Sequence, residues 1–382
     1  MPSGTGRTPP IFIRSAAMRA SAMRFPPFEH LHFYEGLHGA YVNISLSNME
    51  PFPLRGFGRS LPRDLDLNWV PPDGPPELRK LLGKLHGLPA DHVILTSGAT
   101  EGNFLVNAAL VKPGDRVVVD APMYSPLRDC PVGFGAEVVP VARDCKDGWA
   151  LDLDRVRKAM GRRCRLVVFC NLGNPTSAAI SNGELRELAD LAEDRGAYVL
   201  VDETFRELAF RKAPPSAAAF GPRMVALSTV SKLEGLGGLR TGWMVADPGF
   251  LDRVRGIKDY TTVGGSSVAY EVAAWTLRRH SFFVRRAKRI LDVNRRIARD
   301  ALERMPALHG GVPDIGNVLF PHSDVDVARL ERLLLRKYRT VIAHGRFFGQ
   351  GMDKHFRIGI GGKTSELRRG LANLGRALAE LT

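Results

Sequence analysis

Short hydrophobic runs alternate with amphipathic stretches from about residue 93 onward. The runs are rich in β-branched residues and are continuous rather than alternating, which is typical of strands in a sheet covered on both faces. We predict strands at residues 93–95, 116–121, 137–141, 165–171, 198–203, 224–229 and 242–246. Apolar residues at helical spacing predict helices at residues 103–110, 152–160 and 183–194. Strands that alternate with helices indicate βαβ units, so we expect an α/β fold with a mixed, mostly parallel sheet flanked by helices.

The pattern changes after about residue 272, where longer helical stretches replace the alternation. Helices are expected at residues 282–304 and 325–337, and short strands at residues 317–320 and 356–360. A chain of 382 residues is too long for one core of ordinary size. We therefore expect a large domain over residues 56–275 and a smaller α+β domain over residues 276–382, with residues 26–55 as an N-terminal segment that packs on the small domain.

Residues 1–25 differ in composition from the rest, with four arginines, three prolines before Met18 and no acidic residue. An arginine-rich, acid-poor leader is typical of an organelle transit peptide. A disordered extension, or a start codon placed upstream of Met18 or Met23, explains the same pattern. We expect a basic, flexible N-terminal extension. A secretory signal is disfavoured because this stretch has no apolar region of useful length.

The whole chain is basic, with 54 Lys and Arg against 40 Asp and Glu, a net charge of +14. The arginines are spread along the chain without a long block, which favours a solvated charged surface and leaves a nucleic-acid-binding protein as a distant alternative. No apolar run approaches the roughly 18 residues of a membrane span, so no membrane partner is expected. The four cysteines lack C-x-x-C spacing and indicate reduced thiols in a cytoplasmic protein.

Polar residues gather just after the predicted strands, where ligands bind in α/β sheets. The small residues 96–102 precede a helix and predict an anion site, because a helix N-terminus exposes backbone N–H groups. Lys232 follows the strand at residues 224–229 and precedes a glycine-rich stretch that ends at Arg240. A buried or cation-flanked lysine can become a nucleophile because its pKa falls.

Each of these residues also has a structural interpretation when it is taken alone. Lys232 could be a solvated loop lysine, and Asn174-Pro175 a simple turn. Asp202 could cap a helix, and Arg357 could form a surface ion pair. The His30-x-His32 pair could bind a metal, but the sequence places no third ligand beside it. The order and spacing of Lys232, Asn174, Asp202 and Arg357 along the chain favour a shared functional site, because it is improbable that this combination occurs by chance.

The set resembles the class I/II aminotransferases, which are pyridoxal 5′-phosphate (PLP) enzymes of fold type I. The most specific part is the S-T-V-S-K-x-x-G-L-x-G-L-R-x-G-W pattern at residues 228–243, with Asn-Pro-Thr at 174–176 and Asp-Glu at 202–203. The resemblance extends from about residue 67 to the C-terminus. It implies an enzyme that moves an amino group from an amino acid to a 2-oxo acid, and a homodimer in which residues 59–74 reach across the interface.

The resemblance also assigns roles to individual positions. Lys232 would bind PLP as an imine and then carry the proton between Cα and C4′, and Asp202 would pair with the pyridine nitrogen. Asn174 would donate to the phenolic oxygen, and Tyr124 would stack on the ring. The phosphate would be held by Gly98, Ala99, Thr100, Thr229, Ser231 and Arg240. Arg357 would grip the substrate α-carboxylate, aided by Asn174. The side-chain pocket would be shaped by the N-terminal segment at residues 36–50 and by the partner subunit, with Gly39, Tyr41 and His344 as candidates for its lining.

Three positions depart from the family pattern. Phe205 stands where a D-x-x-Y pattern usually places a tyrosine, and Trp69 stands where a tyrosine usually reaches the neighbouring subunit's phosphate. Ser177 replaces the glycine that usually follows Asn-Pro-Thr. Because Phe205 lacks a hydroxyl, a specialised PLP enzyme acting on one amino acid, such as a lyase, decarboxylase, cyclase or oxidase, is the alternative to transamination.

Overall fold

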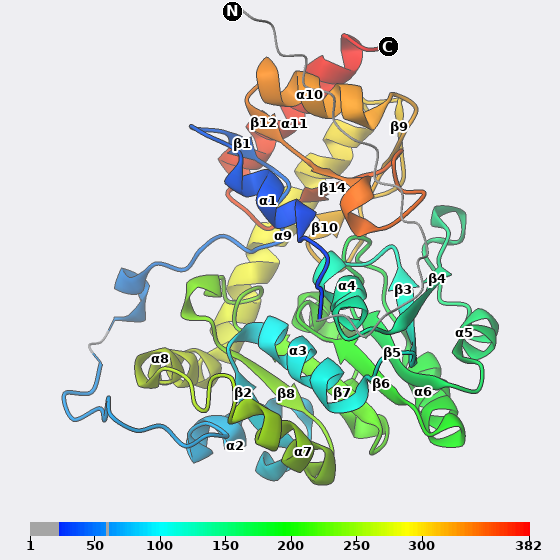
Figure 1. Cartoon of the computed structure of the whole chain (residues 1–382). Coiled ribbons are helices and arrows are strands. Elements are labelled where there is room, and N and C mark those ends of the chain that lie inside the picture. The colour runs from blue at the N-terminus through cyan, green and yellow to red at the C-terminus, as the bar shows by residue number, and fades with distance from the viewer. Residues whose placement is uncertain (1–22, 59–60) are drawn as a thin grey trace, which may run out of the picture.

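The computed structural model describes residues 23–58 and 61–382, so most of the predicted N-terminal extension lies outside the described residues. A seven-stranded sheet with the order β2-β8-β7-β6-β5-β3-β4 forms the centre of the lower half in Figure 1. Strand β8 runs antiparallel to both of its neighbours, and the other pairs are parallel. The strands are β2 Val93–Thr96, β3 Arg116–Ala121, β4 Glu137–Ala142, β5 Cys164–Cys170, β6 Tyr198–Asp202, β7 Met224–Thr229 and β8 Gly242–Val245. This sheet confirms the predicted α/β fold class.

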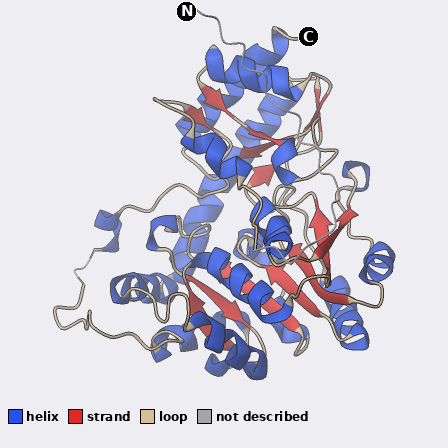
Figure 2. Cartoon of the chain, viewed as in Figure 1, coloured by secondary structure: helices blue, strands red, loops and turns tan. Residues whose placement is uncertain are grey.

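Helices cover both faces of the sheet and bury its continuous apolar runs (Figure 2). They are α2 Pro76–His86, α3 Gly98–Leu110, α4 Ser125–Gly133, α5 Leu153–Met160, α6 Asn182–Arg195, α7 Pro248–Lys258 and α8 Ser267–Arg278. The sequence pattern predicts α3, α5 and α6, and the capping box at Ser181 and Glu184 is present. It misses α2, α4, α7 and α8. Helix α4 contains Pro131, and α8 is buried on most of its circumference and so lacks a polar face.

A second, smaller group of helices and short strands lies above the sheet (Figure 1). Its helices are α9 His280–Leu302, α10 Val327–Arg336 and α11 Thr364–Ala379. Its strands are β9 Leu308–His309, β10 Val318–Leu319, β11 His322–Ser323, β12 Thr340–Val341, β13 Ala343–His344 and β14 Phe356–Gly359. The predicted helices and strands of this region overlap α9, α10, β10 and β14, whereas α11 was not predicted. These elements share one apolar core, which contains Leu291, Leu330 and Leu371.

Helix α9 connects the two cores. Phe283, near its first turn, packs with Trp275 in the core beside the large sheet, whereas Leu291 and Ala298 lie in the core of the smaller group. The predicted domain boundary at residue 276 falls within α8, one helix before this crossing. The assignment of residues 56–275 and 276–382 to separate domains stays a prediction.

The N-terminal segment runs along the smaller group before it reaches the sheet. It begins with α1 Glu29–Glu35, and β1 Val42–Asn43 then pairs in parallel with β12. The carbonyl of Ile44 accepts a 2.7 Å hydrogen bond from the Gly359 amide, and the Glu50 amide donates to the Gly361 carbonyl at 2.7 Å. These backbone bonds place residues 44–50 beside β14.

Short 3₁₀ helices complete the fold: η1 Leu54–Phe57, η2 Ala90–His92, η3 Cys145–Asp147, η4 Arg206–Lys212, η5 Ala217–Phe220, η6 Gly237–Leu239 and η7 Gly345–Phe348. The four cysteines are free thiols. Within residues 23–58 and 61–382, no helix is both long enough and apolar enough to cross a lipid bilayer.

Candidate active site

The carboxyl ends of β5, β6 and β7 open into a cavity of about 470 Å³ between the sheet and the smaller group of elements. Its size falls within the range of roughly 300–1,000 Å³ that is typical of small-molecule sites. Ten of the fourteen site residues expected from the sequence line it: Ala99, Thr100, Tyr124, Asn174, Asp202, Thr229, Ser231, Lys232, Arg240 and Arg357. The topology therefore brings together residues that are up to 258 positions apart (99 and 357) in the sequence.

One end of the cavity has the geometry of an anion site. Helix α3 begins at Gly98, so its first amides point at this end. The Thr229 hydroxyl donates to the Thr241 carbonyl at 2.7 Å and lies 2.8 Å from the Ser231 hydroxyl, which orients the two hydroxyls together. The exposed guanidinium of Arg240 lies against Gly98. A helix N-terminus, two hydroxyls and a guanidinium are suited to a dianionic phosphate.

Two observations favour glycine at position 98. Its φ is +75°, and a Cβ at this position would lie 2.4 Å from Nη2 of Arg240. We expect Gly98→Ala to weaken PLP binding about 10- to 100-fold, because the methyl group would displace the guanidinium from the anion site. Equilibrium dialysis of the apoenzyme against PLP measures this change.

The matched control is Gly114→Ala. Gly114 also has a positive φ (+83°), but no atom lies within 4 Å of the point that a Cβ would occupy there. The substitution imposes a similar backbone strain without the clash. Equal loss of PLP affinity in both variants would contradict a specific role for the contact between Gly98 and Arg240.

Lys232 reaches into the middle of the cavity from the turn after β7. Its Nζ donates to Asn48 Oδ1 at 2.6 Å and to Ser47 Oγ at 3.1 Å, and it lies 5.4 Å from the centre of the Phe205 ring. Burial and the nearby positive charge of Arg357 lower the pKa of Lys232 to about 7, against an opposing effect of Asp202. The amine is therefore available in its neutral, nucleophilic form near neutral pH.

Asp202 ends β6 and is buried at the floor of the cavity. Its Oδ1 accepts a 2.9 Å hydrogen bond from the Thr204 amide. Burial raises the pKa of this carboxyl, while the Thr204 hydrogen bonds and the Lys232 charge act in the opposite direction. A buried carboxylate of this kind is stabilised by a cationic partner, such as a protonated pyridine nitrogen.

Arg357, on β14, forms the opposite wall and is only 3% exposed. Its Nη1 donates to Asn174 Oδ1 at 2.8 Å, and its Nε and Nη2 donate to the Ser45 carbonyl at 3.1 and 2.7 Å. These bonds fix the plane of the guanidinium. A fixed guanidinium in a buried wall is suited to bidentate recognition of a carboxylate.

The N-terminal segment contributes one wall of the cavity. Only residues 46–48 of this wall fall within residues 36–50, the stretch that was expected there. Residues from this segment that line the cavity are Phe28, His30, Leu31, Tyr34, Leu46, Ser47 and Asn48. His30 and His32 lie on α1 rather than in a loop, and His30 Nε2 is hydrogen-bonded to the Tyr34 hydroxyl at 2.7 Å. Burial and the positive charge of Arg357 lower the pKa of His30 to about 3, so this ring is neutral. No motif marks these positions, because their place depends on pairing with distant strands.

The structure does not bring the three side-chain-pocket candidates to the lining of the cavity. Gly39 lies beside the guanidinium of Arg339, and the ring of Tyr41 stacks on that same guanidinium at 3.9 Å. His344 is buried at the start of η7, where its Nδ1 accepts from the Arg346 amide. The pairing of β1 with β12 holds the residues after Tyr41 beside residues 340 and 341, and residues from 28–34 and 46–48 line the cavity instead. A role of the three candidates in a side-chain pocket stays a prediction.

Two of the unusual positions have clear surroundings. Ser177 has a left-handed backbone (φ 59°), which explains why glycine is usual there, and its Oγ donates to the Val318 carbonyl at 2.9 Å. This bond ties the turn after Asn174 to β10. Trp69 is 60% exposed and lies outside the cavity of its own chain.

Comparison with known proteins agrees with this geometry. The family described as "Aminotransferase class I and II" matches residues 65–374. The chain is 33% identical to capreomycidine synthase of Streptomyces vinaceus, over 75% of each chain, and 30% identical to histidinol-phosphate aminotransferase of Symbiobacterium thermophilum, over 79% of this chain and 81% of that one. Its structure resembles a PLP-dependent aminotransferase from Streptococcus suis with a TM-score of 0.87 and 26% identity, covering 94% of this chain and 99% of that one.

The fold and the site together define a PLP-dependent transferase of fold type I. More particularly, the chain belongs to the class I and II aminotransferase family, and it moves amino groups between amino acids and 2-oxo acids. Pyridoxal 5′-phosphate is its cofactor. The anion site at the start of α3, the Lys232 amine with its lowered pKa and the buried Asp202 carboxyl group fit the chemistry of this cofactor.

Proposed function

We propose that Lys232 is the lysine that binds PLP covalently and that the same amine then carries the proton at the substrate Cα. Asp202 holds the pyridine nitrogen protonated, and Tyr124, at the start of α4, packs along the ring. When bound, PLP withdraws electrons from the substrate Cα. The hydroxyls of Thr229 and Ser231, the first amides of α3, which begins at Gly98, and Arg240 bind its phosphate.

We further propose that the substrate is an amino acid whose α-carboxylate binds Arg357. Asn174 already orients Nη1 of this guanidinium, and the Ser45 carbonyl orients Nε and Nη2. The N-terminal wall and Tyr124 line the same cavity as Arg357 and Lys232. A carboxylate held there places the substrate amine beside Nζ of Lys232.

The observation that carries this proposal is the shared cavity of Lys232, Asp202, Asn174 and Arg357. A panel of amino acids, each incubated with PLP-loaded enzyme and no second substrate, tests it. We expect at least one to release one 2-oxo acid per active site, and a 2-oxo acid added afterwards to be aminated in turn. Release of CO₂, ammonia or peroxide with every reactive amino acid, and no such transfer, would contradict it.

A specialised reaction on one amino acid is the second candidate. Phe205 favours it: its ring, rather than a hydroxyl, faces the Lys232 amine. One relative is a synthase by name. The same panel separates the candidates, because only transamination leaves the amino group on the enzyme until an acceptor arrives.

The lowered pKa of Lys232 predicts how the apoenzyme captures PLP. Only the neutral amine attacks an aldehyde, so the rate of covalent capture should rise with pH and level off above a midpoint of about 7, not near the ordinary lysine value of 10.5. Stopped-flow absorbance after mixing with PLP measures the rate. Asp202→Asn should move the midpoint to lower pH, because the Asp202 charge raises the pKa of Lys232. A rate that does not depend on pH between about 6 and 9 would contradict the assignment.

We also propose that the enzyme is a cytoplasmic homodimer. A mostly apolar cleft of about 580 Å³ lies beside the active site, and Leu54, which lines it, is 79% exposed. The exposed side chains of Leu61 and Val268 also line it, and Val268 shares a neighbouring cavity with the exposed Leu67, Trp69 and Val263. A patch of this kind is typical of a protein–protein interface. It includes residues from 61–74, which belong to the segment 59–74 that is expected to reach the neighbouring subunit.

The dimer proposal predicts the effect of charge at this surface. Leu67→Arg combined with Val268→Arg should convert a dimer into a monomer, because each guanidinium would be buried without a partner. Light scattering coupled to size-exclusion chromatography measures the mass. Val132→Arg is the control, since Val132 is also an exposed apolar residue but lies on α4, outside the cleft. A wild-type monomer, or a double variant that stays dimeric, would contradict the proposal.

A further inference from the structure

Three histidines lie side by side on extended segments of the smaller group of elements. In the antiparallel pair of β9 and β11, His309 is directly opposite His322, and an isolated antiparallel bridge places His355 opposite His322 on the other side. Residues that are directly opposite in antiparallel pairs point to the same face. The ring centres are accordingly 5.9 Å apart for His309 and His322, and 5.2 Å apart for His322 and His355.

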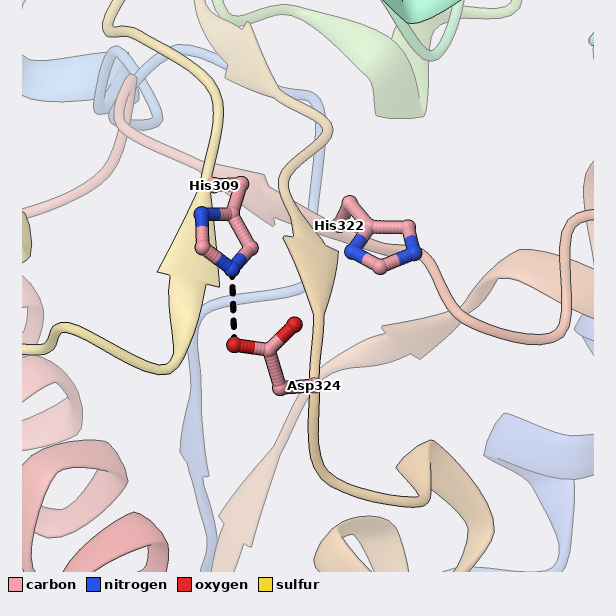
Figure 3. A group of neighbouring side chains, drawn as sticks. All are labelled: His309, His322 and Asp324. Carbon is pink, nitrogen blue, oxygen red and sulfur yellow. Dashed lines mark hydrogen bonds and ion pairs between the residues drawn. The ribbon is translucent and has the colours of Figure 1, made fainter.

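A carboxylate completes this group. Asp324 lies two residues after His322, and its Oδ2 is 2.7 Å from Nε2 of His309 (Figure 3). One ligand atom from each of His309, His322 and Asp324 lies within 4.8 Å of the others. Bonds of about 2.0–2.1 Å to a tetrahedral ion place ligand atoms roughly 3.3 Å apart. Small side-chain rotations of these exposed or half-buried residues therefore suffice to surround an ion.

A second observation points to the same place. His355 is only 7% exposed, yet neither of its ring nitrogens has a hydrogen-bond partner among the described residues. A buried polar group without a partner costs free energy. Its ring packs edge-on against His322, which is one of the three candidate ligands. A water molecule held by an ion at His322 would give His355 the partner that it lacks.

We propose that His309, His322 and Asp324 bind one zinc-class divalent ion, with water as the fourth ligand and His355 as hydrogen-bond partner of that water. Two imidazoles and a carboxylate suit zinc and disfavour magnesium and calcium, which take mainly oxygen ligands. None of the four residues lines the PLP cavity. The ion fastens β9 to β11 and, through the bridge from His322 to His355, to the start of β14, which carries Arg357.

Calorimetric titration of untagged, chelator-treated, PLP-loaded enzyme with ZnCl₂ in phosphate-free buffer tests the proposal. We expect one ion per chain and a rise in melting temperature on binding, and no binding of magnesium. His322→Ala and Asp324→Asn should each weaken zinc binding by about 100-fold or more, since each loses a ligand rather than a supporting group. Both side chains are at least partly exposed, so these variants should fold.

The matched control is His92→Ala. His92 also pairs with a carboxylate, Asp91, at 3.0 Å, but no third ligand group lies beside this pair among the described residues. It should keep the wild-type zinc affinity. The proposal is overturned if the wild type takes up no zinc at a tenfold molar excess, or if His322→Ala binds zinc as tightly as His92→Ala does.

Discussion

Replacement of Lys232 by alanine is expected to lower kcat by about 10⁴-fold or more, the order of loss seen when a covalent catalytic group is removed. In the proposed function the amine of Lys232 both bonds to the cofactor and moves the proton at Cα, and Lys232 is the only lysine among the described residues that line the cavity. Initial rates with the best amino acid of the panel give kcat. Phosphate binding should persist, because the cradle at Gly98, Ser231 and Arg240 does not depend on this amine.

Two measurements separate this loss from misfolding. The melting temperature of Lys232→Ala should stay close to that of the wild type, since burial of this lysine costs free energy that alanine avoids. Lys84→Ala, at an exposed position on α2, is the matched control and should retain full activity. Substantial activity in Lys232→Ala would mean that the covalent bond is made elsewhere, and the proposed function would fail.

Replacement of Arg357 by lysine is expected to lower kcat/KM by about 100-fold, mainly through a higher KM for the amino acid. An ammonium group keeps the charge but cannot present two parallel N–H donors to a carboxylate. It also loses the bonds to Asn174 and the Ser45 carbonyl that fix the wall of the cavity. Steady-state kinetics over a range of amino acid concentrations separates the effects on KM and kcat.

Arg346→Lys is the control for this substitution. Arg346 is also on the smaller group of elements and pairs with Glu331, but it does not line the cavity. It should leave both kinetic constants unchanged. If Arg357→Lys lowers kcat and leaves KM unchanged, Arg357 does not bind the substrate carboxylate in the ground state, and that part of the proposal is wrong.

The sequence predicted the large sheet because its strands are continuous apolar runs that are buried on both faces. It also predicted the ligand-facing residues at strand ends, since a parallel sheet gathers them at one edge whatever the exact packing. Helix α8 escaped prediction because burial on most sides leaves no polar period to detect. The hydrophobic pattern of a segment does not predict its structure where tertiary contacts determine which of its side chains are exposed.

Tertiary contacts also explain why the sequence did not predict which residues of the N-terminal segment line the cavity. Ser47 and Asn48 contact Lys232 from 185 and 184 residues away, and neither residue belongs to a motif. Gly39 was expected in the pocket on the basis of family resemblance alone, but it lies beside Arg339, just before the pairing of β1 with β12, and does not line the cavity. Nothing in the spacing of residues 28–48 indicates which of them face inward.

The contacts of the N-terminal segment have one more consequence. The carbonyl that holds Arg357 belongs to Ser45, and the side chains that hold Lys232 belong to Ser47 and Asn48. In the proposed function, residues 45–48 therefore set the distance between the guanidinium that binds the substrate carboxylate and the amine that reacts at the substrate nitrogen. Insertion of a single residue in this stretch would change the distance between the Arg357 guanidinium and the Lys232 amine. Every amino acid substrate would be affected, whatever its side chain, because all of them share the carboxylate and the amine.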